Sequence, residues 1–376
     1  MKIGELFAGI GGLGLGAAWA FGGHIAWQVE CDRHAAAVLR RRAAPGCSVI
    51  EGDVRDHGLK TLEPVDLLCG GFPCQDLSVA GTRAGLAGER SGLFWEMVRI
   101  VGETRPNAVF IENVPPLFKH RATVDATFEE FGYRTNWAPV TAIEAGAPHR
   151  RRRAFVLAVR GDAPELYRRW WRPGWVPTEP AVAAWTTPTV AERDNQGGAA
   201  GRVGPVRPGL SNAVLPWPKP TIKGGHNRAG LSPASGDGLE TAVRPWPTPC
   251  ARDYRAGADT DYQERRQGSP GLCDAVLGRL NPDWVETLMG FPVGWTDLDA
   301  DVGHKEARAL LYDPMWPAGW VREAPDRGPQ FDWEPPRTMT GPAQRGRPAR
   351  LRQLGNAVVP AQGALALAQL LREGGV

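Results

Sequence analysis

The first 160 residues alternate short apolar runs with stretches of helical periodicity, and this alternation limits the fold more than any other feature of the chain. The runs that predict strands are Ile3–Phe7, Ile25–Glu30, Val65–Cys69, Ala108–Glu112 and Ala154–Val159, with one more strand ending at Glu51. The stretches that predict helices are Gly12–Ala20, Arg33–Arg42, Phe94–Glu103 and Thr123–Phe131. Such alternation is typical of βαβ units and predicts an α/β fold, a mostly parallel sheet with helices on both faces.

The middle of the chain differs, because proline and tryptophan gather there. Of the 34 prolines, 24 fall within residues 173–350, 9 precede this region and 1 follows it. A weak Trp-x-x-Pro repeat occurs at Trp185–Pro188, Trp217–Pro220 and Trp246–Pro249. Units that are this irregular and this rich in proline favour a loop-built domain over a regular repeat array.

Regular structure is expected again near the end of the chain. Ala and Leu dominate Ala364–Arg372, which predicts a helix. The length of 376 residues suits two domains. We therefore predict an α/β domain formed by residues 1–164 and 341–376, and a smaller, loop-rich domain over residues 165–340.

Charge and cysteine content exclude several classes of protein. The formal net charge is only +3, which excludes a uniformly basic nucleic-acid coat but allows a local basic patch. The 6 cysteines lack the paired spacing of a zinc site or of a secreted disulfide framework. The sequence suggests neither a signal peptide nor an apolar stretch of roughly 18 residues, the length that a membrane helix needs. We expect a cytoplasmic protein without a metal.

A glycine cluster, Phe7–Gly14, directly follows the first predicted strand. Gly9, Gly11 and Gly14 match the pattern GxGxxG, and the acid Glu30 ends the next strand. This combination is typical of a dinucleotide site, and it fits equally well a nucleoside cofactor that has no phosphate. A tight turn without a ligand is the third alternative.

A further acid, Asp53, follows the third predicted strand. Its carboxylate could accept an adenine amino group, or it could cap a helix.

The segment Gly70–Gln75 follows the strand Val65–Cys69 and contains Cys74. Ligands bind outside the carboxyl ends of parallel strands, so a nucleophile would be useful at Cys74, although a lone buried thiol is usually structural. The stretch that follows is rich in glycine and carries Arg83 and Arg90, which indicates either a lid that touches phosphates or an ordinary surface loop.

Two polar sites complete the pattern. Glu112 ends a predicted strand, where a carboxyl group could act as a general acid. His149 and four arginines precede the strand Ala154–Val159. Alternation along an extended chain puts Arg151 and Arg153 on one face and Arg150 and Arg152 on the other, so one pair could reach into a site while the other contacts the backbone of a polymer.

These motifs, in this order, resemble those of the DNA (cytosine-5) methyltransferases of bacteria and phages. Motifs I, IV, VI, VIII, IX and X of that family resemble Phe7–Gly12, Gly71–Gln75, Glu112–Val114, Arg151–Arg153, Leu288–Pro292 and Gly355–Val358. Two departures are His149, where the family has Gln, and Val359-Pro360, where Pro-Pro is common. Residues 165–280 match no motif, as expected for a variable target-recognition region.

The resemblance implies a Rossmann-like S-adenosylmethionine-dependent domain, which carries the chemistry, and a target-recognition domain. The implied enzyme is a sequence-specific DNA (cytosine-5-)-methyltransferase that acts on a flipped cytosine. Cys74 would attack C6 of the base, Glu112 would bind N3, and Arg153 with Arg151 would stabilise O2. S-adenosylhomocysteine would be the product.

The resemblance also implies three sets of contacts. The cofactor would contact Phe7, Ala8, Gly9, Ile10, Gly11, Gly12, Glu30, Cys31, Asp53, Val54, Pro73, Leu93, Asn356, Ala357 and Val358. The DNA would contact Gln75, Ser78, Arg83, Arg90, Lys223, Asn227, Arg228, Arg252 and Asp253. The implied partners are duplex DNA and a restriction endonuclease that cuts the same site, and the protein would be a monomer that binds no membrane.

Three alternatives stay open at this point. A nicotinamide-dependent oxidoreductase would explain the glycines and Glu30, but it would leave Pro73–Gln75 and Glu112–Val114 without a role. An RNA cytosine methyltransferase would share the fold, although the long insertion between Arg153 and Met289 favours a reader of duplex DNA. A non-catalytic DNA-binding module would not need Cys74.

Overall fold

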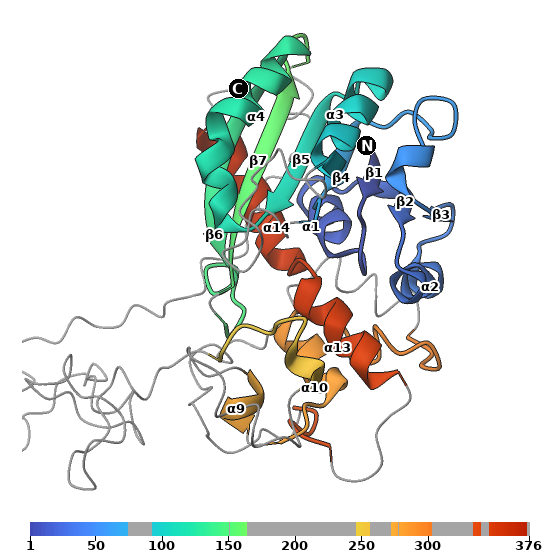
Figure 1. Ribbon diagram of the computed structural model, residues 1–376, viewed down its shortest axis with the longest axis vertical. Coiled ribbons are helices and arrows are strands. Elements are labelled where there is room, and N and C mark those ends of the chain that lie inside the picture. Colours follow the sequence, from blue (N-terminus) through green and yellow to red (C-terminus); the bar gives the residue numbers. More distant parts are fainter. Residues whose placement is uncertain are drawn as a thin grey trace, which may run out of the picture.

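The computed structural model describes the chain in eight stretches. They are residues 1–73, 92–149, 151–163, 246–255, 272–276, 278–302, 334–339 and 346–373. Within these stretches, a seven-stranded sheet has the order β3-β2-β1-β4-β5-β7-β6 (Figure 1). Its strands are β1 (Lys2–Leu6), β2 (His24–Glu30), β3 (Ser48–Glu51), β4 (Leu67–Gly70), β5 (Ala108–Asn113), β6 (Tyr133–Thr141) and β7 (Arg152–Arg160).

Helices follow the strands as the alternation predicts. The helices of the first part are α1 (Gly12–Phe21), α2 (Arg33–Arg42), α3 (Gly92–Thr104) and α4 (Arg121–Glu130), with the short 3-10 helices η1 (Val54–Asp56) and η3 (Pro115–His120). Later in the chain come η6 (Asp253–Arg255), α9 (Leu272–Val276), α10 (Pro282–Leu288), α13 (Arg347–Asn356) and α14 (Pro360–Glu373).

Strands β1 to β5 run parallel to one another, whereas β7 is antiparallel to both β5 and β6. The order reverses at β1, which lies between β2 and β4. In open α/β sheets, a ligand binds at the carboxyl ends of the strands beside such a reversal. The topology therefore places a binding site after β1, β2 and β4.

Alternate residues of the central strands enter two separate cores. On β5, Phe110 packs with helices α1 and α14, while Val109 and Ile111 pack with α3 and α4 on the opposite face. Strand β7 divides its side chains in the same way, with Phe155 on one side and Val156 on the other. This period of two confirms the predicted mostly parallel sheet with helices on both faces.

Strand β6 is missing from the sequence prediction, and its place in the sheet explains why. The segment mixes polar residues with Pro139 and shows no clean alternation. It forms an edge of the sheet and, within the described residues, pairs with β7 alone. One side of an edge strand needs no hydrogen bonds, so a proline is tolerated there.

Helices α1 and α14 bring the two ends of the chain together at very short range. A Cβ atom on Gly12 would lie 2.1 Å from the Val358 carbonyl oxygen, and one on Gly16 would lie 2.4 Å from the Pro360 carbonyl oxygen. Glycine is therefore required at both positions. As a result, the segment Ala357–Val359 lies directly against the start of α1.

The helices α10 and α13 lie beyond one end of the sheet (Figure 1). Arg350 of α13, almost fully buried, forms ion pairs with Asp283 at 2.5 Å and with Glu286 at 2.8 Å. Trp295 donates from Nε1 to the Ile10 carbonyl oxygen at 3.1 Å. The C-terminal segments are thus fixed to the glycine turn that follows β1.

One expectation about the C-terminal region is wrong. The stretch Arg347–Arg372 is long and apolar enough to cross a membrane by length and composition, although no such stretch was expected. Within its most apolar window, 78% is buried inside the protein. Its apolar side chains form the core that α1 also lines, so packing accounts for its composition.

The boundary at residue 340 between the two predicted domains stays a prediction. Trp246, Leu272 and Trp284 fall inside the predicted second domain, and they share one buried core with α1 and α14.

Candidate active site

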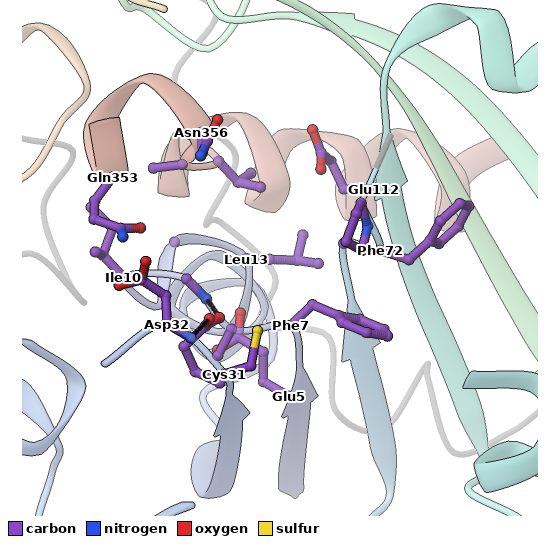
Figure 2. A pocket seen from close by; sticks show the side chains of 18 of the residues that line it. Glu5, Phe7, Ile10, Leu13, Cys31, Asp32, Phe72, Glu112, Gln353 and Asn356 are labelled. Atoms are coloured by element: carbon purple, nitrogen blue, oxygen red, sulfur yellow. Dashed lines mark hydrogen bonds between the residues drawn. The ribbon is translucent and has the colours of Figure 1, made fainter. Parts of the chain in front are cut away.

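A cavity of about 480 Å³ opens at the carboxyl ends of β1, β2, β4 and β5 (Figure 2). Figure 2 shows Cys31 and Asp32 at one end of the cavity, Glu112 at the other, and Gln353 and Asn356 on the helix above. Most residues that the sequence assigned to the cofactor line it, namely Phe7, Ala8, Gly9, Ile10, Gly12, Glu30, Cys31, Asp53, Val54, Pro73, Leu93, Asn356, Ala357 and Val358. Glu112, Arg151 and Arg153, which the sequence assigned to the chemistry, line it too.

The turn between β1 and α1 forms the floor of the cavity. Phe7, Gly9 and Gly11 have φ values of 55°, 56° and 88°, so three of five residues adopt the left-handed region. This conformation is costly for Phe7, and such strain often occurs at functional turns.

Gly11 faces away from the main cavity. It lines a second cavity of about 470 Å³, together with Gln28, Leu39 and Cys47. The structure thus gives Gly11 a role in shaping the turn, and direct contact with a cofactor in the main cavity is no longer expected of it.

Glu30 joins two loops that border the cavity. One carboxylate oxygen accepts a hydrogen bond from the Gly9 N–H at 2.7 Å, and the other accepts one from the Asp32 N–H at 2.7 Å. A carboxylate oxygen has two lone pairs, so each can accept one more donor. Glu30 is therefore oriented by the backbone before any ligand binds.

Asp53 caps a helix, one of the two roles that the sequence left open, and it also lines the cavity. Its carboxylate accepts hydrogen bonds from the Arg55 backbone N–H at 3.0 Å and from the Arg55 guanidinium at 2.6 Å. These hydrogen bonds lower the pKa of Asp53 to about 2. The group is thus an anion at the pH of a cell.

Glu5 is a buried acid in the cavity wall that the sequence analysis missed. It accepts hydrogen bonds from the Gly14 N–H at 2.7 Å and from the Gln28 side-chain amide at 2.6 Å. Burial raises the pKa of Glu5 to about 7. An acid inside an apolar strand, Lys2–Leu6, was the signal that could have revealed it.

Glu112 and Arg153 form an ion pair at the far end of the cavity. Arg153 Nε lies 2.7 Å from Glu112 Oε1, and the two side chains are 16% and 11% exposed. A Cβ atom on Gly71 would lie only 3.2 Å from Glu112 Oε2. The loop after β4 therefore passes against this carboxylate.

Asn113 fixes that loop in place. Its side-chain amide donates to the Phe72 carbonyl oxygen at 3.0 Å, and its oxygen accepts from the Val114 N–H at 2.8 Å. Pro73, the next residue of the loop, lines the cavity. The following residue, Cys74, lies outside the described residues.

Arg151 lines the same cavity as Arg153, as the alternation predicts, but its guanidinium contacts the protein backbone. Arg151 Nη1 donates to the Pro249 carbonyl oxygen at 3.3 Å and to the Gly355 carbonyl oxygen at 3.0 Å. The residue is only 3% exposed. Its placement favours a supporting role over the contact with the base that the sequence suggested.

His149, where the family has Gln, is completely buried. Burial, and to a smaller extent the positive charge of Arg151, lower the pKa of His149 to about 3. The imidazole is therefore neutral and adds no positive charge to those of the two arginines.

The C-terminal wall contains two residues that the sequence analysis did not single out, Arg352 and Gln353. Arg352 Nη2 lies 3.5 Å from Asp32 Oδ2, and this pair spans the cavity from α13 to the loop after β2. They lie three and two residues before the recognised motif Gly355–Val358, so an extension of that motif by three residues would have included them.

Most of the predicted DNA-contacting residues are not among those that the structure describes. Gln75, Ser78, Arg83, Arg90, Lys223, Asn227 and Arg228 lie outside the described residues. Arg252 is exposed, as a DNA contact must be. Asp253 is buried, and its carboxylate accepts hydrogen bonds from the Cys250 N–H at 2.8 Å and the Cys250 thiol at 2.9 Å. The carboxylate shapes a turn, which favours a structural role for Asp253 over the predicted contact with bases.

No cluster of three or more metal-binding side chains occurs among the residues that the structure describes.

Comparison with known proteins places these observations in a family. Residues 1–187 match the model of the C-5 cytosine-specific DNA methylases. The chain is 40% identical over 171 residues to the Type II methyltransferase M.AluI of Cellulosimicrobium cellulans. This match covers 41% of this chain and 32% of that protein. It is 33% identical over 163 residues to the Type II methyltransferase M.HhaI of Haemophilus parahaemolyticus. This match covers 42% of this chain and 49% of that protein. The matches thus span a third to a half of these relatives.

A solved structure shows the same fold. The S. pombe Dnmt2 methyltransferase superposes on this chain with a TM-score of 0.51 at 14% identity, over 100% of both chains. The glycine turn, the loop that leads to Cys74 and the strand end that carries Glu112 all lie within the matched residues 1–187. The chain therefore belongs to the family of C-5 cytosine-specific DNA methylases.

Proposed function

We propose that this protein is a sequence-specific DNA methyltransferase that transfers a methyl group from S-adenosylmethionine to C5 of a cytosine in duplex DNA. The Glu112–Arg153 pair carries this proposal, because it lies in the same cavity as the glycine turn and beside the loop that leads to Cys74. Family membership and the Type II methyltransferases among the relatives support it.

The cavity suits S-adenosylmethionine in size and in chemistry. Small-molecule sites usually have volumes of about 300–1,000 Å³, and this cavity has about 480 Å³. Glu30 is oriented to accept the ribose hydroxyls, and the ionised Asp53 is suited to accept the adenine amino group. Acidic side chains also suit the positive sulfonium, whose role is to supply the methyl group.

Glu112 and Arg153 would stabilise the charge that develops on the base. Attack at C6 pushes electron density onto N3 and onto O2, the oxygen of the neighbouring ring carbon C2. A carboxyl group and a guanidinium 2.7 Å apart can meet both positions at one edge of the ring. Glu112 would hold a proton at N3, and Arg153 would donate to O2.

Cys74 would act as the nucleophile. Its thiolate bonds to C6, which makes C5 nucleophilic enough to accept the methyl group. A base then removes the proton from C5, and the pair of electrons left behind expels the Cys74 thiolate from C6. Over the whole cycle, the methyl group replaces the C5 proton and the Cys74 thiolate is regenerated, so the reaction needs no metal and no redox reagent.

The target cytosine must leave the DNA helix to reach this cavity. Flipping the base costs a few kcal/mol, and the contacts in the pocket must offset this cost. We propose that the residues around the Trp-x-x-Pro units read the DNA sequence, that the protein acts as a cytoplasmic monomer, and that a restriction endonuclease acts on the same site.

The test is bisulfite sequencing of plasmid DNA from cells that express the protein. We expect 5-methylcytosine at one short sequence, and cells that express Cys74→Ser should show none. Purified protein assayed with labelled S-adenosylmethionine on duplex DNA and on tRNA separates a DNA enzyme from an RNA enzyme. Transfer to tRNA alone, or to neither, would disprove the proposal.

A further inference from the structure

A single guanidinium joins three segments that are far apart in the sequence. Arg151 stands directly before β7 and donates from Nη1 to the carbonyl oxygens of Pro249 and Gly355. The first acceptor belongs to the segment Trp246–Cys250, which we call the return segment. The chain re-enters the described structure there after residues 164–245. The second acceptor belongs to the end of α13.

The backbone of Arg151 is itself firmly held. Its carbonyl oxygen accepts a hydrogen bond from the Ala142 N–H at 2.8 Å and another from the Gln362 side-chain amide at 2.8 Å. Gln362 is fully buried and also donates to the Val140 carbonyl oxygen at 2.9 Å. The guanidinium therefore extends from a rigid base in the sheet.

The return segment is anchored at both of its ends. The Trp246 N–H donates to the Pro148 carbonyl oxygen at 2.9 Å, and the indole packs edge-on against Trp284 with ring centroids 5.1 Å apart. At the other end, Asp253 accepts the Cys250 N–H. The segment therefore cannot move away from Arg151 without breaking these contacts.

The return segment also touches α13 directly. A Cβ atom on Gly355 would lie 2.1 Å from the Cys250 carbonyl carbon and 2.1 Å from the Ala251 nitrogen. No side chain separates the two backbones, so a displacement of the segment must displace Gly355. The next residue, Asn356, lines the cofactor cavity.

Arg151 also lies close to the catalytic pair along the chain. Arg153 follows two residues later on the same side of the extended backbone, and both arginines line the cavity. The hydrogen bonds that hold the Arg151 backbone therefore also help to fix Arg153 and its partner Glu112.

We propose that Arg151 is a positioning residue that couples DNA recognition to the cofactor cavity. This inference rests on the proposed function. Docking of the correct DNA sequence at the exposed Arg252, two residues after the return segment, would set the position of Pro249. Arg151 would transmit that position through Gly355 to the Asn356 wall of the cavity. Such coupling is reciprocal, so the bound cofactor product would in turn tighten binding of the correct DNA.

Arginine suits this role better than lysine. Its planar guanidinium offers donors in a fixed geometry, whereas an ammonium group on a flexible chain fixes the relative position of two carbonyl groups poorly. Arg151→Lys keeps the positive charge and weakens the mechanical link, so this substitution is the sharpest test.

The experiment measures the affinity for S-adenosylhomocysteine by calorimetry, without DNA and with a duplex that carries the methylated sequence. For the wild type we expect the duplex to tighten binding by about 5-fold or more, which is the lower range of typical allosteric coupling. For Arg151→Lys we expect this ratio to fall to about 1. A duplex without the site should give no tightening in either protein.

The matched control is Arg347→Lys. Arg347 is another buried arginine that donates to backbone carbonyl oxygens, those of Leu280 at 3.0 Å and Tyr254 at 3.2 Å, and it does not line the cavity. It should lose a similar amount of thermal stability but keep the wild-type ratio.

The outcomes separate the inference from the proposed function. If the wild type transfers no methyl group to DNA, the proposed function fails. If the wild type methylates DNA but shows no coupling, the inference is wrong. It is equally wrong if Arg151→Lys keeps the ratio, or if both lysine variants lose it together.

Discussion

Glu112 and Arg153 meet at 2.7 Å because two neighbouring strands of the sheet run in opposite directions. Glu112 lies near the carboxyl end of β5, and in the antiparallel register it stands opposite Phe155 of β7. Arg153, two residues before Phe155, therefore points to the same end of the sheet. Every parallel strand of the sheet ends at this edge, which is why the pair faces the cavity and not the core.

Replacement of Glu112 by Gln should slow methyl transfer without altering the choice of DNA sequence. The amide keeps the shape of the side chain but can neither hold a proton for N3 nor balance the charge of Arg153. We expect the single-turnover rate to fall by roughly 100- to 10,000-fold, the usual contribution of a positioned acid or base. The control is Glu144→Gln, an exposed acid, which should keep the wild-type rate. A changed sequence preference of Glu112→Gln would contradict the assignment.

Cys74→Ser should abolish methyl transfer and leave cofactor binding almost unchanged. A serine hydroxyl is a far weaker nucleophile than a thiolate near neutral pH, while the residues that line the cavity are unaltered. Rates on duplex DNA and affinities for S-adenosylmethionine measure the two effects separately. Cys47→Ser serves as the control, because Cys47 is half-buried and lines only the second cavity. Methylation by Cys74→Ser at the wild-type rate would exclude the covalent mechanism.

DNA with 5-fluorocytosine at the target position should trap the protein. The fluorine at C5 cannot leave as a proton, so the reaction stops with Cys74 bonded to C6. We expect a complex that survives denaturing electrophoresis, requires S-adenosylmethionine and does not form with Cys74→Ser. Failure to detect such a complex under conditions of normal turnover would show that Cys74 does not attack C6.

The sequence was sufficient to predict the parts of the fold and site in which local pattern and tertiary structure agree. The strand that ends at Glu30 and the glycine turn are examples, because period and turn chemistry both act over a few residues. Strand β6 was missed since its pairing with β7 is a tertiary effect that outweighs the presence of Pro139. Local propensity carries no information about such a partner.

The structural contacts of some predicted site residues could not be foreseen for a related reason. Arg151 lies in a recognised motif and Asp253 follows a Trp-x-x-Pro unit, and the sequence suggested a substrate contact for each. Their true partners, Gly355 and Cys250 among them, come from the backbone and become visible only in the folded structure. Glu5 was overlooked although its place inside the apolar strand Lys2–Leu6 was a signal, because its partners Gly14 and Gln28 are identified only in the folded structure.

The two adjacent residues Arg252 and Asp253 should behave differently when they are replaced. Arg252 is exposed and available for DNA, so Arg252→Ala should relax or weaken site recognition, with about 1–3 kcal/mol of discrimination lost if it makes a bidentate base contact. Asp253→Asn should lower thermal stability and leave the sequence preference intact, because the buried carboxylate holds the turn at Cys250. Methylation profiles over a randomised duplex library, with melting temperatures of both variants, check this. A specificity change in Asp253→Asn alone would reverse our assignment.

Stability should fall between about pH 4.5 and pH 7 because of Glu5. Burial raises the pKa of this carboxyl from 4.5 to about 7, so the folded protein holds the proton more tightly than the unfolded chain does. Protonation therefore favours folding, and its contribution is complete below the unfolded pKa and lost as the pH rises through 7. At about 1.4 kcal/mol per pH unit, the loss over this window amounts to roughly 3 kcal/mol as an upper bound.

Glu5→Gln isolates this effect, because the amide cannot ionise. The difference between the free energies of unfolding of the variant and the wild type, measured with urea from pH 4.5 to pH 8, should change steadily in favour of the variant. The slope should vanish above pH 7.5 or so, where Glu5 is ionised in both states. Glu130→Gln, an exposed acid on α4, should show a difference that does not depend on pH. A flat difference for Glu5→Gln as well would mean that Glu5 stays ionised throughout this range, held by its hydrogen bonds from Gly14 and Gln28.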